Sequence, residues 1–393
     1  MTFSRRARAR ARVTAAPLLL ALALSAGACA PEPQPDPESA SSAAASPSAS
    51  PTPTPTQLTD LEKAAQRVEA MPIREQAALV VMGYAAGTDP AAIAAYVADG
   101  PDSVILMGDN IPATPEQLRA LTDAVHAASP DALIATDQEG GGVARLSWDD
   151  LPSARMLKQQ SPADAQAAFA ARARLLEQAG IDINFGVVAD VPRTDGSFIY
   201  GRSYGTDPQA VADRVAAIVA GEQGLVATTL KHFPGHGAAE GDSHHAIPTT
   251  DLSVDEWRAV DALPFRAGID AGAELVMMGH LRFTAVSDQP ASLSPEWYAI
   301  LRDELGFTGV AVTDDLGMLL SSGDPAYADP VANAVMAIDA GADLVLTIAG
   351  STPETAGRII DAISVRAASD EGFADRLSDA ATRVAVLADE TRG

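Results

Sequence analysis

The chain has 393 residues, with 27 Lys or Arg against 52 Asp or Glu, so its formal net charge at pH 7 is −25. So acidic a protein is not expected to bind nucleic acid or an anionic membrane surface. Its only cysteine is Cys29, which excludes a disulfide within one chain.

Residues 1–28 have the pattern of a secretory signal peptide. Five arginines between positions 5 and 12 form a basic region, and an apolar segment at 15–24, too short to span a membrane, follows. Small residues at 25–28 precede Cys29. This arrangement resembles the bacterial lipoprotein box, in which the cysteine is acylated and becomes the mature N-terminus. We therefore expect a protein lipid-anchored to the outer face of the cell membrane, or a secreted protein if Cys29 is not acylated.

The next segment, residues 29–57, is rich in Pro, Ser, Thr and Ala and ends in repeated Pro-Thr pairs. Such a composition cannot bury enough apolar surface to offset its ordering entropy. We predict a disordered tether between the lipid anchor and a catalytic domain at residues 58–393.

Within residues 58–393, short apolar runs alternate with Ala-rich amphipathic segments. The predicted helices include 162–178, 208–222 and 326–340. Eight apolar runs are predicted strands, at 79–82, 103–107, 132–136, 183–188, 225–230, 274–278, 309–313 and 343–347. Eight strands alternating with helices favour a single-domain α/β fold, the (β/α)8 barrel of the TIM type. An open doubly wound sheet is the alternative, but no Gly-rich phosphate turn follows the first predicted strand.

Polar side chains follow five of the predicted strands, which is where parallel α/β enzymes place their active sites. The densest group is residues 231–245, with one of only three lysines and four of the six histidines. Carboxylates, Arg, Lys and His that converge at one end of a barrel suit a ligand rich in hydroxyl groups. The residues that follow the strands include Asp137, Arg145, Asp190, Arg202, Lys231, His232, Asp242, His244, His280, Asp314 and Asp315.

Seven motifs, in order along the chain, resemble glycoside hydrolase family 3, and specifically its bacterial β-N-acetylglucosaminidase branch. The resemblance covers residues 58–390, and at Gly142 the chain departs from the Arg that most relatives have. The motifs start at the following residues: Asp137 (DQEGG), Gly201 (GRSY), Lys231 (KHFPGHG), Asp242 (DSH), Leu263 (LPFR), Leu305 (LGFTGV) and Val312 (VTDDLGM).

The resemblance implies a role for each matched residue. Asp314 matches the catalytic nucleophile, His244 the general acid/base, and Asp242 the partner of that histidine. The positions that hold the hydroxyl and acetamido groups of the sugar match Asp137, Arg145, Arg202, Lys231 and His232.

The chemistry of the Asp-Ser-His run fits such a role. Hydrolysis of a glycoside needs a proton donor to the leaving oxygen and a carboxylate that traps the oxocarbenium-like centre. If the run is extended, Asp242 and His244 point to the same side, so the carboxylate can bind one imidazole nitrogen while the other faces the substrate. The ordinary imidazole pKa of ~6.5 suits proton exchange near neutrality.

Two further questions arise from the residues themselves. Asp315 is the rival of Asp314 as nucleophile, and side-chain parity cannot choose between them, because barrel strands are apolar on both faces; only the resemblance favours Asp314. The spacing of His232, His236, His244 and His245 matches no standard metal site, so we predict neither a metal nor a cofactor.

The leading functional prediction is a monomeric, retaining exo-β-N-acetylglucosaminidase that acts on peptidoglycan fragments. One alternative is another member of the same family, such as a β-glucosidase, a xylosidase or a phosphorylase that uses phosphate in place of water. A second alternative is a non-catalytic lipoprotein that binds wall sugars.

Overall fold

The computed structural model describes residues 58–392, and the predicted signal peptide, Cys29 and tether lie outside the described residues. Eight parallel strands form one sheet in the order β10-β1-β2-β3-β4-β5-β7-β9. These are β1 (Val81–Gly83), β2 (Ser103–Leu106), β3 (Leu133–Thr136), β4 (Ile183–Val188), β5 (Ala227–Phe233), β7 (Leu275–Met278), β9 (Val310–Thr313) and β10 (Val345–Leu346). Two short strands in loops, β6 (Thr249–Thr250) and β8 (Arg282–Phe283), pair separately in parallel.

The sheet closes between its first and last strands. β10 pairs with β1 on one side, and on the other a parallel bridge joins Val312 of β9 to Leu344, with the Thr313 N–H donating to the Leu344 carbonyl at 3.0 Å. A closed parallel sheet surrounded by helices is a (β/α)8 barrel, which confirms the predicted fold and excludes the open sheet. Each of the eight predicted strands overlaps one of these strands.

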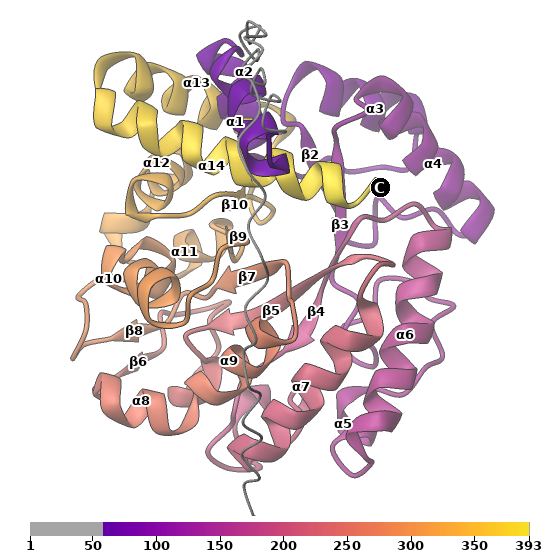
Figure 1. The fold of residues 1–393 in the computed structure, drawn as a ribbon, viewed down its shortest axis with the longest axis vertical. Helices are drawn as coiled ribbons and strands as arrows, with labels where there is room; N and C mark the ends of the chain where they lie inside the picture. Colours follow the sequence, from indigo (N-terminus) through magenta and orange to yellow (C-terminus); the bar gives the residue numbers. More distant parts are fainter. Residues whose placement is uncertain (1–57, 393) are drawn as a thin grey trace, which may run out of the picture. The chain divides into compact units, whose positions relative to one another are not determined.

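Figure 1 shows the helices around the strands, with α14 (in yellow) beside α1 and α2. The α-helices are α1 (Asp60–Glu69), α2 (Ile73–Leu79), α3 (Pro90–Asp99), α4 (Pro115–Ala128), α5 (Ala154–Leu157), α6 (Pro162–Gln178), α7 (Pro208–Glu222), α8 (Val254–Val260), α9 (Ala262–Asp270), α10 (Pro295–Ala299), α11 (Gly317–Ser321), α12 (Pro330–Ala340), α13 (Pro353–Ser369) and α14 (Glu371–Glu390). Shorter turns are η1 (Phe198–Gly201), η2 (His236–Ala238), η3 (Ala291–Leu293), the π-helical η4 (Ile300–Glu304) and η5 (Pro325–Tyr327).

Helix boundaries follow local capping chemistry. α6 and α7 have the predicted bounds, because the side chains of Ser161 and Asp207 each accept the N–H group of the third helical residue and Pro occupies the first turn of each helix. The third predicted helix, 326–340, begins later than expected. Asp329 caps α12 at Pro330, and the preceding residues form the separate turn η5.

Strand β5 extends further than predicted. The sequence pattern placed its end at residue 230, with Lys231 and His232 in the following loop, but the strand continues to Phe233. Lys231 and His232 are 2% and 5% exposed, and both have charged partners. A polar side chain can occupy a buried strand when it is paired in this way. The apolar run alone could not show those partners, so the predicted end was wrong.

Side chains that point inward fill the barrel. This inner cluster includes Met82, Ile105, Phe185 and Val312 from four different strands, and Leu387 of α14 packs against it. Helix α14 therefore covers one end of the barrel, next to Glu274 and Gly309, which precede β7 and β9. The opposite end, where the strands finish, is left for polar chemistry.

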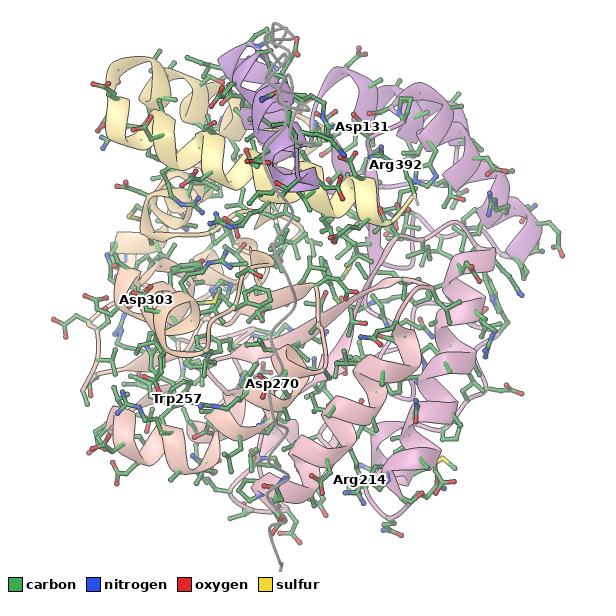
Figure 2. All side chains as sticks on the ribbon, in the orientation of Figure 1. Asp131, Arg214, Trp257, Asp270, Asp303 and Arg392 are labelled. Carbon is green, nitrogen blue, oxygen red and sulfur yellow. The ribbon has the colours of Figure 1, made fainter. Side chains whose placement is uncertain are left out.

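Aromatic rings pack edge to face outside β5. Phe233 contacts the rings of Trp257, Phe265 and Trp297 at centroid separations of 5.8, 5.2 and 5.8 Å. The indole N–H of Trp257, labelled in Figure 2, donates to the Pro234 carbonyl at 2.7 Å. Such contacts add to the burial of apolar area and hold the C-terminal end of β5 in place.

None of the helices in residues 58–392 is both long enough and apolar enough to cross a membrane. The C-terminal helix is tied back to the barrel by Arg392, whose guanidinium pairs with Asp131 just before β3. Both residues are labelled in Figure 2.

Barrel closure generates a prediction about stability. Asp343 lies just before β10 and is fully buried. It pairs with three guanidinium groups, those of Arg302 in η4 and of Arg376 and Arg383 in α14. It also accepts the Ala311 N–H at 2.9 Å. Asp343→Ala leaves these guanidinium groups without their anion. It should lower the free energy of unfolding by about 3–5 kcal/mol in chemical denaturation.

The matched control is Asp123→Ala, which breaks the exposed Arg119–Asp123 pair of α4. An exposed pair contributes about 0–1 kcal/mol, so this variant should stay close to the parent. Equal losses in the two variants would contradict a special role for Asp343 in closing the barrel.

Candidate active site

The floor of the site is a buried ammonium group between two carboxylates. Lys231 of β5 places its Nζ 2.8 Å from Asp137 Oδ1 and 2.7 Å from Glu139 Oε1, both in the segment after β3. Burial lowers the pKa of Lys231, but the two carboxylates raise it more, so the pKa lies above its ordinary value and the group stays charged.

Two arginines complete this charged floor. Arg145 Nη2 lies 3.1 Å from Asp137 Oδ2, and Arg202 binds Glu139 through Nε and Nη2 at 2.9 and 2.6 Å. Burial raises the pKa of Asp137, but the charges of Lys231 and Arg145 outweigh it and bring the pKa to about 2. Three cations therefore face two ionised carboxylates, and a neutral hydroxylated ligand meets fixed hydrogen-bonding groups.

The segment that carries Asp137 and Arg145 is held by side chains beneath it. Gln138 Oε1 accepts the Arg145 N–H at 2.7 Å, and Gln138 Nε2 donates to Asp149 at 2.6 Å. Asp149 in turn pairs with Arg172 of α6 at 2.7 Å, and neither side chain is exposed. A Cβ at Gly142 would meet no atom within 4 Å, so the departure at this position leaves open space without disturbing this network.

His232 is held in one orientation by two charged partners. Nδ1 of the ring lies 2.8 Å from Asp190 Oδ2, and Nε2 lies 3.4 Å from Arg202 Nη2. Because arginine can only donate, Nε2 accepts from Arg202 and Nδ1 donates to Asp190. Burial, followed by the charge of Arg202, lowers the pKa of His232 well below its ordinary value. Asp190 also accepts the backbone N–H of His236, at 2.6 Å.

The two adjacent aspartates after β9 have different partners. Asp315 accepts the backbone N–H groups of Gly317, Ile348 and Ala349 at 2.8–2.9 Å, so its carboxylate joins two loops. Asp314 accepts only the N–H of Asp315 among the described residues. The structure thus separates two side chains that strand parity could not distinguish.

Asp314 is held ionised. Burial raises the pKa of Asp314, but the imidazoles of His232 and His280 lower it more, so the pKa lies below its ordinary value. The backbone N–H of Asp315 and the charge of Lys231 act in the same direction. A carboxylate that stays charged near neutral pH can act as a nucleophile.

Asp242 and His244 contact one another as the sequence predicted, although the backbone between them does not have the expected form. Asp242 Oδ1 lies 2.6 Å from His244 Nδ1 and also accepts the His244 N–H at 3.0 Å. The segment is a turn, in which the N–H groups of His245 and Ala246 donate to the Asp242 carbonyl, so the two side chains meet across a turn and not along an extended run. The short side chain of Asp242 favours this turn by binding the backbone two residues on.

Ser243 anchors the same turn to the buried His236. It is 5% exposed, and its Oγ lies 3.1 Å from Nε2 of the buried His236. His244 and Asp242, by contrast, have side chains that are 54% and 32% exposed. The turn is therefore fixed at its middle residue and presents His244 to solvent.

A cavity of about 380 Å³ at the C-terminal ends of the strands unites these groups. Apolar residues, among them Met107, Met277 and Leu346, form part of its wall. Its polar lining comprises Asp137, Arg145, Arg202, Lys231, His232, Ser243, His244, Asp314, Asp315 and Ser321. Seven of the eight catalytic and sugar-binding residues predicted from the sequence line it, and Asp242 contacts it through His244. The ninth predicted site residue, Cys29, lies outside the described residues.

A larger cavity of about 570 Å³ lies at the other end of the barrel, beside the starts of β7 and β9. Its lining includes Asp270, Glu274 and Arg383 but none of the predicted site residues. Active sites of such barrels form at the C-terminal ends of the strands, so the smaller cavity is the candidate. Across residues 58–392, no cluster of three or more His, Cys, Asp or Glu side chains is arranged to hold a metal ion.

Sequence reasoning gave no role to Glu139 or Asp190, although both are central to the site. Glu139 binds Lys231 and Arg202, and Asp190 orients His232. Asp190 stood among the polar residues that follow predicted strands, and Glu139 lies in the DQEGG motif directly after one. Their position was therefore a usable signal, but which cation each would bind was not visible in the sequence.

Comparisons with known proteins give a consistent result. Residues 86–387 match the family described as glycosyl hydrolase family 3 N terminal domain. A β-hexosaminidase of Stenotrophomonas maltophilia is 39% identical over 263 residues, which cover 63% of this chain and 76% of that protein.

Two solved structures are similar at the level of the fold and the sequence. A glycoside hydrolase family 3 β-N-acetylglucosaminidase from Paenibacillus sp. has a TM-score of 0.76 and 31% identity, over 82% of this chain and 63% of that one. A β-N-acetylhexosaminidase from Beutenbergia cavernae has a TM-score of 0.73 and 30% identity, over 81% of this chain and 98% of that one.

Proposed function

The chain belongs to glycosyl hydrolase family 3 and is a glycoside hydrolase, and on this basis we propose that it is a retaining exo-β-N-acetylglucosaminidase. Its proposed substrates are peptidoglycan-derived fragments with a terminal β-linked N-acetylglucosamine. The observation that carries the proposal is that Asp314 and His244 line the same cavity. The names of the similar proteins support the hexosamine specificity, and the predicted export signal supports a substrate in the cell wall.

The reaction follows from the chemistry of these two groups. His244 donates the proton on Nε2 to the glycosidic oxygen while Asp314 attacks the anomeric carbon, so the leaving group departs as an alcohol and a covalent glycosyl-enzyme forms. The same imidazole then removes a proton from water, which displaces Asp314 and restores the original configuration. Asp242, through its 2.6 Å contact with Nδ1, stabilises the imidazolium, which donates the proton in the first step and forms again when water is deprotonated in the second.

The charged floor has the complementary task of holding the terminal sugar. Lys231, Arg145 and Arg202 offer donors, and the carboxylate of Asp137 offers acceptors, to the hydroxyl and acetamido groups. Because these side chains are already paired with one another, they keep their positions before the substrate arrives. Such preorganisation lowers the cost of reaching the transition state.

The first functional prediction concerns the substrate. The purified protein should hydrolyse 4-nitrophenyl N-acetyl-β-glucosaminide with a much higher kcat/KM than the corresponding β-glucoside, with and without phosphate. A higher kcat/KM on the glucoside would overturn the proposed specificity. Activity that depends on phosphate, with release of the sugar 1-phosphate, would identify a phosphorylase instead.

The second prediction tests the nucleophile against its neighbour. Asp314→Asn should lower kcat on the order of 10⁴-fold or more, the size of effect seen when one member of a covalent catalytic unit is removed, and should still bind N-acetylglucosamine. Asp315→Asn should lose stability, because its carboxylate joins two loops, but should still be labelled by a fluorosugar inactivator. Mass spectrometry that finds the label on Asp315, or NMR that finds an inverted product, would refute the assignment.

The third prediction tests the acid/base. His244→Ala should lower kcat/KM by about 10²–10⁴-fold for substrates with sugar leaving groups, and by much less for activated aryl glycosides, which need little protonation. His245→Ala is the matched control, since its side chain is 82% exposed and 3.8 Å from Asp242. An equal loss on both substrate types would argue against proton donation by His244.

Localisation stays a proposal that rests on the sequence. We expect acylation at Cys29 to anchor the protein outside the cell membrane. Cys29→Ser should therefore move the protein from the membrane fraction to the medium or to an unprocessed precursor, as followed by immunoblotting. Mature protein that remained membrane-bound in this variant would count against acylation at Cys29.

A further inference from the structure

An exposed aromatic ring lies beside the proposed acid/base. Phe198 begins η1 in the loop after β4, and 41% of it is exposed, whereas its neighbours Ser197 and Ile199 are 8% and 0% exposed. It is the only aromatic residue among the exposed large apolar residues of the described chain. Single exposed apolar residues are common on protein surfaces, so what singles out Phe198 is its position.

The Phe198 ring contacts the catalytic turn directly. Its centroid lies 6.1 Å from that of His244 in an edge-to-face arrangement and 5.5 Å from that of His236. His236 is itself bonded to Ser243, the anchor of the turn. Two imidazole rings therefore contact Phe198, and part of its side chain stays exposed beside the turn that carries His244.

The direction of the reaction determines what lies at this mouth. The cavity has a closed, charged floor of Lys231 and Asp137, which receives the terminal sugar. His244 protonates the oxygen that joins this sugar to the next, so the next sugar must lie on the outer side of His244. Phe198 borders His244 but does not line the cavity that holds the terminal sugar.

We propose that Phe198 is the binding platform for the second sugar of the substrate, the one that departs as the leaving group. Pyranose rings carry C–H groups on one face that pack against an aromatic ring, while their hydroxyl groups at the edge stay in water. The proposal rests on the proposed function and adds the residue that recognises the leaving-group side. It predicts that the enzyme gains binding energy from a sugar leaving group that a small leaving group cannot provide.

The kinetic experiment compares two substrates of the full-length protein. They are β-1,4-linked di-N-acetylglucosamine, which has a sugar leaving group, and N-acetyl-β-glucosaminyl fluoride, which has none. Phe198→Ala should lower kcat/KM for the disaccharide about five- to tenfold, as expected for one ring contact, and change that for the fluoride less than about twofold. Phe198→Trp, which keeps a flat ring, should restore the disaccharide rate, whereas Phe198→Leu, which is apolar without a ring face, should not.

Equal losses on both substrates would overturn the proposal, because they would mean that Phe198 acts only through His244 or the terminal sugar. Unchanged kinetics on both would overturn it as well. The melting temperature of each variant should stay close to that of the parent. The change in kcat/KM then reports the loss of the ring and not a loss of folded protein.

A binding experiment separates this inference from the proposed function. Calorimetry on Asp314→Asn, with and without Phe198→Ala, measures Kd for the disaccharide and for N-acetylglucosamine. The Phe198 substitution should raise only the disaccharide Kd, about five- to tenfold. If the variants bind both sugars in this way but the parent protein does not hydrolyse the disaccharide, the function is refuted and the platform is kept. An unchanged disaccharide Kd would refute the platform alone.

Discussion

A buried ammonium group must be neutralised where it lies, and the site is organised around this requirement. Lys231 is 2% exposed in the middle of the barrel end, so the cost of removing its charge from water has to be offset by partners of opposite charge. Asp137 and Glu139 meet that need from the segment after β3. Asp137 also binds Arg145 of the same segment, and Glu139 binds Arg202 of the loop after β4. One buried charge on β5 thereby fixes the loops after β3 and β4.

The proposed catalytic groups differ in burial, and the difference fits their chemistry. Asp314 lies at the end of a barrel strand, where nearby imidazoles and the ammonium of Lys231 keep its carboxylate charged. His244 lies on a turn with more than half of its side chain exposed, where the water that it deprotonates in the second step can reach it. A rigid nucleophile and an accessible acid/base are thus supplied by two kinds of structure, a strand end and an anchored turn.

Two adjacent carboxylates, Asp314 and Asp315, show how neighbouring residues of the same type acquire different tasks. Asp315 faces the loop after β10 and receives three backbone N–H groups, so it is a structural tie. Asp314 faces the cavity among cationic and imidazole groups. Both residues lie just after β9 and both line the cavity, so the distinction arises from the partners that the fold brings to each carboxylate.

The sequence by itself determined the barrel, because hydrophobic runs at regular spacing and helix caps such as Ser161 and Asp207 are local signals. It also located the site, since polar residues after parallel strands converge wherever those strands end. Only the tertiary structure decided that β5 continues through Lys231 and His232, that Asp242 and His244 meet across a turn, and that Glu139 and Asp190 orient the charged groups. These outcomes depend on partners distant in the chain, such as Glu139 for Lys231, and the balance between desolvation and pairing is set only when folding brings such partners together.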